Sequence, residues 1–193
     1  IKNEISKNLN IGLDVELLKN KLEMNLDFFR NDRSRIITTR SETMSGIVGQ
    51  TLAYENIGSV LNKGFELMLK HQNRVGEVGY FAQANVSFAR NKITYMDEVQ
   101  GLESWLYKTG QPVGVLRGLE AVGFFNTQEE IDGWAKSTYG TVQPGDVKYV
   151  DQNNDNIIDE NDFIPLGYNN IPEWNFGLNF GFNYKNFDLT ALF

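Results

Sequence analysis

The sequence contains no cysteine, only 4 prolines and a single histidine among its 193 residues. The lack of cysteine excludes disulfide frameworks, thiolate metal sites and thiol nucleophiles. No uninterrupted apolar run approaches the roughly 18 residues of a membrane-spanning helix, which excludes a helical inner-membrane protein. The 18 basic and 25 acidic residues give a net charge of -7. This charge predicts no nucleic-acid partner, because phosphate binding needs concentrated Lys and Arg.

Catalytic motifs are also lacking, since the sequence contains no GxSxG elbow, P-loop or HExxH. His71 falls in the polar segment 71–77, HQNRVGE, which we predict to be a turn, so a solvated imidazole is favoured over a general base. Glu129 and Glu130 are adjacent on a predicted helix and point to different faces, so they cannot act as a pair. We therefore predict that the protein is not an enzyme.

Aromatic residues and glycine are abundant, with 13 Phe, 8 Tyr, 3 Trp and 18 Gly, a composition that favours strands over helices. Residues 174–184 alternate strictly between apolar side chains and Asn or Gly, which is the period of a β-strand. The pattern restarts at Phe187 after Lys185 and Asn186 and continues to Phe193, so the connection is a tight hairpin. The chain stops inside this second alternating run, and we expect a fragment of a longer protein.

The same period recurs upstream in residues 11–17, 22–28, 65–69 and 78–88. When the strands are allowed to extend a few positions beyond these runs, short connections alternate with two long ones of about 25 and about 80 residues. Loops that long are rare in compact soluble domains. Antiparallel strands with short turns at one end and long loops at the other are typical of a transmembrane β-barrel. We predict an all-β fold, six antiparallel strands of such a barrel, with residues 92–171 forming a large extracellular loop region within one domain, 1–193.

The two faces of the predicted strands suit a membrane environment. One parity is aromatic and aliphatic, as lipid contact requires, and the other carries mostly Asn, Gly, Glu and Asp, which suits a wet lumen. Trp174, Tyr184 and Phe187 fall at strand ends, where amphipathic rings prefer the membrane interface. A basic cluster beside Asp32, which we interpret as a solvated rim, contains Arg30, Arg33 and Arg35. The alternative is a soluble β-sandwich, whose apolar parity would face inward.

The long loop contains two local patterns. Thr127 followed by Glu130 predicts a capping box, in which Thr127 caps the backbone donors of a short helix and Glu130 reaches back. The segment 151–162, DQNNDNIIDEND, places oxygen ligands with the spacing of a calcium loop of EF-hand type. The predicted calcium (Ca²⁺) ligands are Asp151, Asn153, Asp155, the backbone carbonyl of Ile157, Asp159 and Asp162.

This calcium loop departs from the usual pattern in two places. Asn156 replaces the preferred Gly, although Asn tolerates positive φ, and Asp162 replaces the bidentate Glu. The preceding GDVKYV reads as a strand and not a helix, so the loop would not form part of an EF-hand pair. The alternative is a solvated turn rich in Asn and Asp.

From Gly145 to Leu189 the sequence resembles SusC/RagA-type TonB-dependent outer-membrane transporters of Bacteroidetes, in which a G-D-[IV]-K-Y-x-D segment enters an acidic loop and a Pro-containing turn leads to an aromatic strand. The segment 62–66, NKGFE, is similar to the N-[KR]-G-x-E motif of TonB-dependent receptors. Residues LRGLEAVGFFNTQEEIDGW are similar to the large extracellular loop of that family.

The resemblance implies a bacterial outer-membrane localisation and a barrel of about 22 strands around a plug, with this chain supplying six strands. It also implies a nutrient importer for an oligosaccharide or peptide, with a SusD-like surface lipoprotein over the mouth, TonB pulling on the plug, and outer-membrane lipid around the wall. Two other classes stay open, a soluble calcium-dependent carbohydrate-binding β-module and a passive porin.

Overall fold

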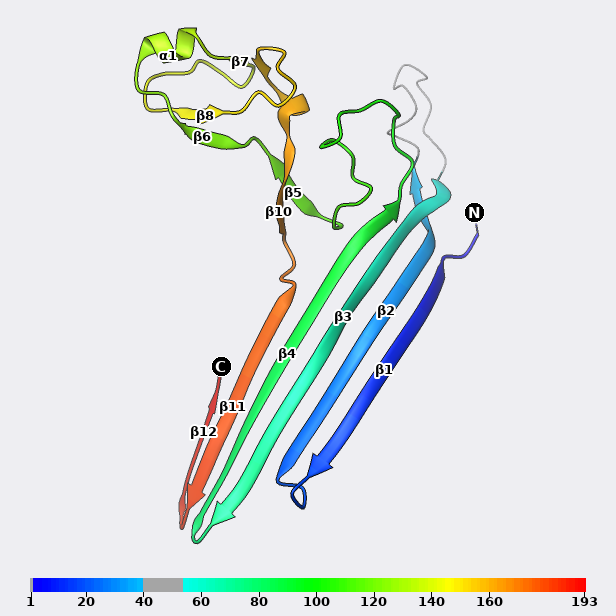
Figure 1. The fold of residues 1–193 in the computed structure, drawn as a ribbon, viewed down its shortest axis with the longest axis vertical. Coiled ribbons are helices and arrows are strands. Elements are labelled where there is room, and N and C mark those ends of the chain that lie inside the picture. The colour runs from blue at the N-terminus through cyan, green and yellow to red at the C-terminus, as the bar shows by residue number, and fades with distance from the viewer. Residues whose placement is uncertain (1, 40–53) are drawn as a thin grey trace.

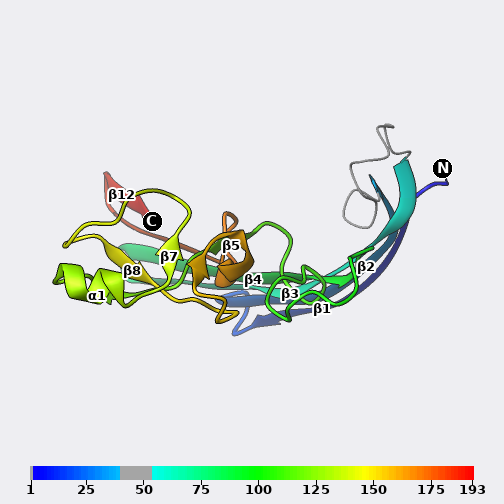
Figure 2. The same ribbon diagram turned by 90° about the horizontal axis from the view of Figure 1, so that it is seen from above.

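The computed structural model describes residues 2–39 and 54–193, and most of this chain is one open antiparallel sheet. Six strands pair in the order β1-β2-β3-β4-β11-β12 (Figure 1). They are β1 (Ile5–Leu17), β2 (Leu22–Thr39), β3 (Tyr54–Val75), β4 (Val78–Tyr95), β11 (Trp174–Tyr184) and β12 (Phe187–Leu192). The sheet forms an arc rather than a plane (Figure 2). The all-β antiparallel architecture predicted from the sequence is confirmed.

Short turns lie at one end of the sheet and long connections at the other (Figure 1). The β1–β2 turn passes through three residues with positive φ, at Leu18, Lys19 and Asn20. Gly76 with φ 62° turns β3 into β4, and Lys185 with φ 52° turns β11 into β12. The β4–β11 connection, residues 96–173, lies at the opposite end, whereas the β2–β3 connection covers 40–53 and falls outside the described residues.

The strands are longer than the alternating pattern predicted. β3 continues to Val75, so the predicted turn at 71–77 is wrong for most of its length, and the true turn is formed by Gly76 and Glu77. His71 therefore lies within β3, opposite Leu22 on β2 and Ala82 on β4, with its ring 5.6 Å from that of Tyr80. The ladder with β4 continues through this polar stretch to Val75, whereas the register with β2 ends at His71. Strand formation here depends on the neighbouring strand more than on local composition.

The register aligns apolar residues with apolar residues across the sheet. Leu26 of β2 lies opposite Leu13 and Leu67, and the same row continues through Val86 to Phe176. The side chains of this face are widely exposed, with Phe176 at 72%. Among the described residues, the only large side chains buried from solvent are Phe125, Ile158 and Asp162. None of the three belongs to the six-stranded sheet, so the sheet has no core of its own.

The β4–β11 connection folds into a lobe beyond the end of the sheet (Figure 1). Three two-stranded sheets build it, pairing β5 with β10, β6 with β8, and β7 with β9. These elements are β5 (Val115–Gly118), β6 (Ala121–Phe124), α1 (Gln128–Asp132), β7 (Lys136–Ser137), β8 (Val147–Tyr149), β9 (Ile157–Ile158), a 3₁₀ turn (Glu160–Asp162) and β10 (Ile164–Asn169). In the part of the chain that the structure describes, no helix has the length and apolar character needed to cross a bilayer.

Candidate functional site

The apolar face of the sheet carries a row of aromatic rings toward the end with the long connections. Phe28, Phe65, Phe88 and Trp174 lie directly opposite one another on β2, β3, β4 and β11, and we call them the aromatic row. Their ring centroids are 6.3, 6.1 and 4.7 Å apart in that order. Tilted and edge-on ring pairs at these separations are favourable. The predicted placement of Trp174, Tyr184 and Phe187 at strand ends is confirmed.

The opposite face is polar and carries most of the charge of the strands. The Lys70 ammonium forms an ion pair with the Glu23 carboxylate at 3.1 Å. The Asp14 carboxylate accepts a hydrogen bond from the Asn25 side-chain amide at 2.5 Å. A shallow hollow of about 530 Å³ lies on this face. Its polar lining residues are Asn25, Asp27, Glu66, Asn85, Ser87 and Asn175.

An asparagine ladder crosses the polar face nearer the long connections. Asn8, Asn31, Asn62 and Asn91 lie directly opposite one another on β1, β2, β3 and β4. The hydroxyl of Ser6 donates to the Asn8 and Asn31 side-chain oxygens, both at 3.0 Å. The Asn91 oxygen accepts from the backbone N–H of Val113, at 2.6 Å, which ties the long connection to the sheet. The ladder offers amide donors and acceptors to whatever occupies the space beside this face.

The NKGFE motif gains a physical explanation from its place in β3. Asn62 belongs to the asparagine ladder, while Phe65 belongs to the aromatic row on the other face. Gly64 has no room for a side chain, because a Cβ there would clash with the Phe88 carbonyl oxygen and lie 2.7 Å from the Phe29 ring. Glycine at this position therefore permits the close approach of β4 and the inward packing of Phe29.

The helix cap predicted in the lobe is present. The Thr127 hydroxyl accepts from the Glu130 backbone N–H at 3.3 Å, and α1 follows at Gln128–Asp132. Glu130 reaches back, as predicted, but its carboxylate accepts from the Asn126 backbone N–H at 3.0 Å, one residue before the cap. Hydrogen bonds to Asn126 lower the pKa of Glu130 below its usual value, because they favour the ionised carboxylate.

A groove in the lobe, which we call the aromatic groove, has four aromatic side chains in its lining. It has a volume of about 320 Å³ and is lined by Phe125, Trp134, Tyr139 and Tyr149 together with buried Ile158. The Trp134 indole donates to the Tyr149 carbonyl at 2.8 Å, which fixes its orientation.

Cations help to hold the lobe together. The Lys148 ammonium lies 3.9 Å from the Trp134 ring centroid, a distance typical of a cation–π contact. Arg117 donates from one guanidinium nitrogen to the carbonyls of Trp105 at 2.6 Å and Phe163 at 3.0 Å. The sequence pattern had not indicated a role for Arg117, since a lone Arg in a loop carries no local signal of its distant partners.

The acidic loop 151–162 is held by hydrogen bonds from its carboxylates to its own backbone. Asp151 accepts from the backbone N–H groups of Asp155 and Asn156, at 3.2 and 2.7 Å. Asp155 in turn accepts from the Ile157 N–H at 2.8 Å. Asn156 adopts φ 64°, the left-handed conformation for which glycine is preferred at the sixth position of a calcium loop. The lobe strand predicted from GDVKYV is present as β8, Val147–Tyr149.

Asp162 and Asp159 have structural partners in this loop. Asp162 is fully buried and accepts from the backbone N–H groups of Gln152 and Asp159, at 2.8 and 3.0 Å. Asp159 accepts from Asn161 at 2.7 Å and caps the 3₁₀ turn. Among the described residues, no group of three or more His, Asp or Glu side chains is arranged to hold a metal ion. The predicted calcium ligands thus share one loop, and calcium binding stays a prediction.

Tyr139 links the acidic loop to the aromatic groove. Its ring stacks on that of Phe163, with centroids 6.3 Å apart and planes 14° apart. Partial burial raises the pKa of Tyr139, and the negative charges of Glu160, Asp159 and Asp162 raise it further. The acidic loop therefore imposes a negative potential on one side of the groove.

Together these features define a class of protein. A curved antiparallel sheet with an exposed apolar face, a polar opposite face, short turns at one end and an elaborate loop at the other is the wall of a transmembrane β-barrel. The chain belongs to the β-barrel family of TonB-dependent receptors: the family model described as "TonB dependent receptor-like, beta-barrel" matches residues 1–192. The resemblance to TonB-dependent transporters read from the sequence is confirmed at this level.

Named relatives come from Formosa agariphila. TonB-dependent receptor P26 is 28% identical over 204 residues, covering 98% of this chain and 20% of that receptor. TonB-dependent receptor P3 is 27% identical over 207 residues, covering 100% of this chain and 20% of the relative. The chain therefore spans about one fifth of the length of the curated relatives it matches.

Solved structures with the same fold include two of RagAB. The RagAB peptide transporter matches with a TM-score of 0.70 at 21% identity, over 98% of this chain and 20% of that chain. The RagAB peptide importer in the "closed-closed" state matches with a TM-score of 0.67 at 19% identity, with the same coverage. At these identities the likeness shows the fold, which agrees with the six-stranded barrel wall.

Proposed function

We propose that this chain is part of a bacterial outer-membrane importer that takes up an oligosaccharide or a peptide. Membership of the TonB-dependent receptor family carries the proposal. In it, TonB supplies the energy through segments outside these residues, and a SusD-like surface lipoprotein binds over the extracellular mouth. This chain contributes wall, periplasmic turns and an extracellular lobe, and it carries out no chemical step.

The height of the apolar face supports insertion in a bilayer. Phe65 and Val75 mark the aromatic row and the turn end of β3, ten residues apart. Ten residues of strand span roughly 33 Å. At a tilt of about 40° this is a height of about 25 Å, which matches the apolar band of outer-membrane barrels. The rings of Tyr184 and Phe187 lie at the turn end and supply the second aromatic girdle.

The sheet edges support a larger barrel. β1 and β12 are the outer strands of the sheet, and within residues 2–39 and 54–193 no strand pairs with the second edge of either. Unpaired backbone N–H and C=O groups are costly in hydrocarbon, so a membrane wall has to continue on both sides until it closes. The relatives are about five times longer than this chain, which leaves room for the remaining wall.

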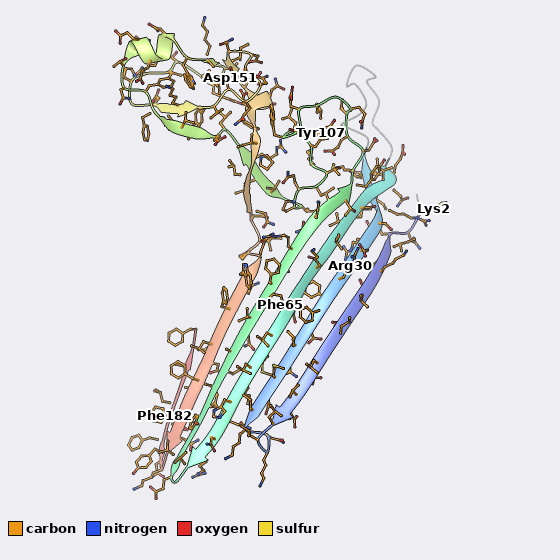
Figure 3. The ribbon with its side chains drawn as sticks, viewed as in Figure 1. Lys2, Arg30, Phe65, Tyr107, Asp151 and Phe182 are labelled. Atoms are coloured by element: carbon orange, nitrogen blue, oxygen red, sulfur yellow. The ribbon has the colours of Figure 1, made fainter. Side chains whose placement is uncertain are left out.

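The lobe at 115–169 is the part of this chain best placed to meet a partner outside the membrane. It projects beyond the sheet at the end with long connections, and Asp151 lies in its outer part (Figure 3). Its aromatic groove beside acidic Asp159 and Glu160 offers both stacking and hydrogen-bonding groups. We assign to the lobe the contact with the surface lipoprotein.

Calcium in the loop 151–162 forms a second part of the proposal. The left-handed backbone at Asn156 and the acceptor pattern of Asp151 and Asp155 support it. Several carboxylates in one short loop repel one another, and a bound cation would reduce this repulsion and rigidify the loop. Binding requires side chains to turn away from their present backbone partners.

Import is tested with the full-length receptor that contains this chain. Cells lacking the receptor are complemented with the parent gene or with a variant whose residues 115–169 are replaced by a short Gly/Ser linker. Uptake of labelled oligosaccharide and peptide mixtures is measured with and without TonB. We expect uptake to require the receptor and TonB, and the lobe variant to lose co-purification with the surface lipoprotein.

Two outcomes would contradict the proposal in different ways. Recovery of the receptor in the soluble fraction would favour the calcium-dependent carbohydrate-binding module. Uptake that persists without TonB would favour a passive porin. Heat-dependent migration on SDS gels serves as the control, because it shows that the lobe variant still forms a folded barrel.

A further inference from the structure

The outer, apolar face of the sheet carries a patch of exposed basic side chains just beyond the aromatic row. We call it the basic patch, and its members are Lys7, Arg30, Lys63, Arg90 and Lys92. All five occupy the strand parity that faces away from the polar lumen side. Arg30 lies closer than Phe65 to the end of the sheet with long connections (Figure 3). The patch stands out in a chain whose net charge is -7.

The register brings three of these cations into one row. Lys63 on β3 lies directly opposite Arg30 on β2 and Arg90 on β4. Like charges directly opposite each other on neighbouring strands are destabilising. Repulsion between these three cations therefore costs free energy. An anion placed over the row would reduce this repulsion.

Two carboxylates compensate the outer members of the row but not its centre. Arg30 pairs with Asp32 at 2.8 Å, and Arg90 pairs with Glu173 at 2.6 Å. Among the described residues, no carboxylate forms an ion pair with Lys63. In the described part of the chain, two of the five cations thus have a carboxylate partner, and Lys63 at the centre of the row has none.

The position of the patch along the strands indicates a lipid headgroup as the anion. Lys63 is two residues beyond Phe65 on the same face of β3, which is about 5 Å higher along the membrane normal for a strand tilted by about 40°. Aromatic girdles mark the boundary between hydrocarbon and headgroups. The Arg90 guanidinium lies 5.3 Å from the Phe88 ring centroid, so this long side chain rests on the girdle while its charge reaches the headgroup layer.

We propose that the basic patch binds the phosphate group of an anionic lipid in the outer leaflet. Arg30 and Arg90 supply planar guanidinium donors on both sides, and Lys63 supplies the central charge. Each basic side chain close to an anionic membrane surface adds to the attraction. The lipid would hold this part of the wall at a fixed height in the membrane. This inference rests on the proposed outer-membrane location, but not on import or on any substrate.

The test uses the full-length receptor purified in a neutral detergent and titrated with short-chain phosphatidic acid, with bound lipid counted by native mass spectrometry. Parent protein is compared with the triple variant Arg30→Gln, Lys63→Gln, Arg90→Gln. We expect the affinity to fall roughly fivefold for each charge removed. Lys70→Gln is the matched control, because Lys70 lies on the same strand but on the polar face, where it pairs with Glu23.

Three results would overturn the inference: equal binding by the parent and the triple variant, equal loss in Lys70→Gln, or full displacement of the lipid by millimolar inorganic phosphate, which would indicate a site for soluble anions. Heat-dependent gel migration checks that the triple variant is folded, and single variants of Lys63 replace it if it is not. Loss of uptake in cells with normal lipid binding would instead count against the proposed import alone.

Discussion

Phe88 and Trp174 lie directly opposite each other on β4 and β11, with ring centroids 4.7 Å apart and planes tilted by 46°. Between the two strands the chain runs through the whole lobe before it returns to the sheet. This ring pair therefore closes the longest connection in the described chain at the point where the sheet resumes. The Phe65 ring lies beside both, with its centroid 6.1 Å from that of Phe88 and 5.9 Å from that of Trp174.

The coupling between these rings is measurable. We expect a double-mutant cycle of Phe88→Ala and Trp174→Ala to give a coupling free energy of about 0.5–1.5 kcal/mol, because offset aromatic pairs contribute this much beyond their burial. Urea unfolding of the full-length receptor in lipid vesicles supplies the four free energies. Phe28 and Phe187 lie on non-neighbouring strands toward opposite ends of the apolar face, so this pair serves as a control and should show no coupling. Equal coupling in both cycles would contradict the prediction.

Gly64 is predicted to be intolerant of any side chain. We expect Gly64→Ala to reduce the free energy of unfolding by about 1–3 kcal/mol, because overpacking at a site without space forces the backbone apart. Here the obstacle is the carbonyl oxygen of Phe88 on the next strand. Gly177→Ala is the matched control, since a Cβ there lies at an ordinary 3.6 Å from Asn85. Comparable effects of both variants on urea unfolding would refute the steric explanation.

The start of α1 should depend on pH through Glu130. Its pKa is lowered in the folded protein by hydrogen bonds to Asn126. A depressed carboxylate pKa stabilises the folded form above the ordinary Glu value, and this stabilisation is lost as the pH falls through the lowered pKa. We therefore expect Glu130→Gln to reduce hydrogen-exchange protection of α1 at neutral pH, but to match the parent in strong acid.

The control for this pH effect is Asp132→Asn at the other end of α1. Protection factors are corrected for the intrinsic exchange rate at each pH before the comparison. A loss of protection in Glu130→Gln that has the same size at every pH would show that the hydrogen bond, and not the charge, stabilises the cap.

Asp162 is predicted to hold the acidic loop together with or without metal. Its buried carboxylate accepts two backbone N–H groups. We expect Asp162→Asn to lower local stability by about 1.5–3 kcal/mol, the range for hydrogen bonds to charged groups. Limited proteolysis of the loop reports this change, and exposed Glu160→Gln should leave the cleavage rate near that of the parent. Equal sensitivity of both variants would contradict a structural role for Asp162.

Calcium addition gives a separate test of the loop. We expect the full-length receptor to bind calcium at about 10⁻⁴–10⁻³ M, the range of extracellular modules. Calcium should slow proteolysis within 151–162, chelation should reverse the effect, and Asp155→Asn should abolish it. Asp132→Asn, outside the loop, is the control. Proteolysis that is unchanged by calcium in the parent would remove the metal from the proposal.

The sequence was sufficient to indicate the sheet, its two faces and its turn end, because period-two alternation is a local property of a strand with one apolar and one polar face. The cap at Thr127 was likewise readable, since its partners lie within four residues. His71 shows where the local pattern was misleading: five polar or charged residues in seven look like a turn, but pairing with β4 keeps residues 71–75 in the ladder.

The chain alone thus determined the class of fold and which residues face which side. Only the tertiary structure decided which residues of neighbouring strands lie opposite each other. Register places Lys63 between Arg30 and Arg90, brings the Phe88 carbonyl against Gly64, and buries Asp162 beneath backbone donors from a distant part of its loop. These relationships depend on pairing between strands far apart in the sequence, where a shift by one residue would exchange the two faces.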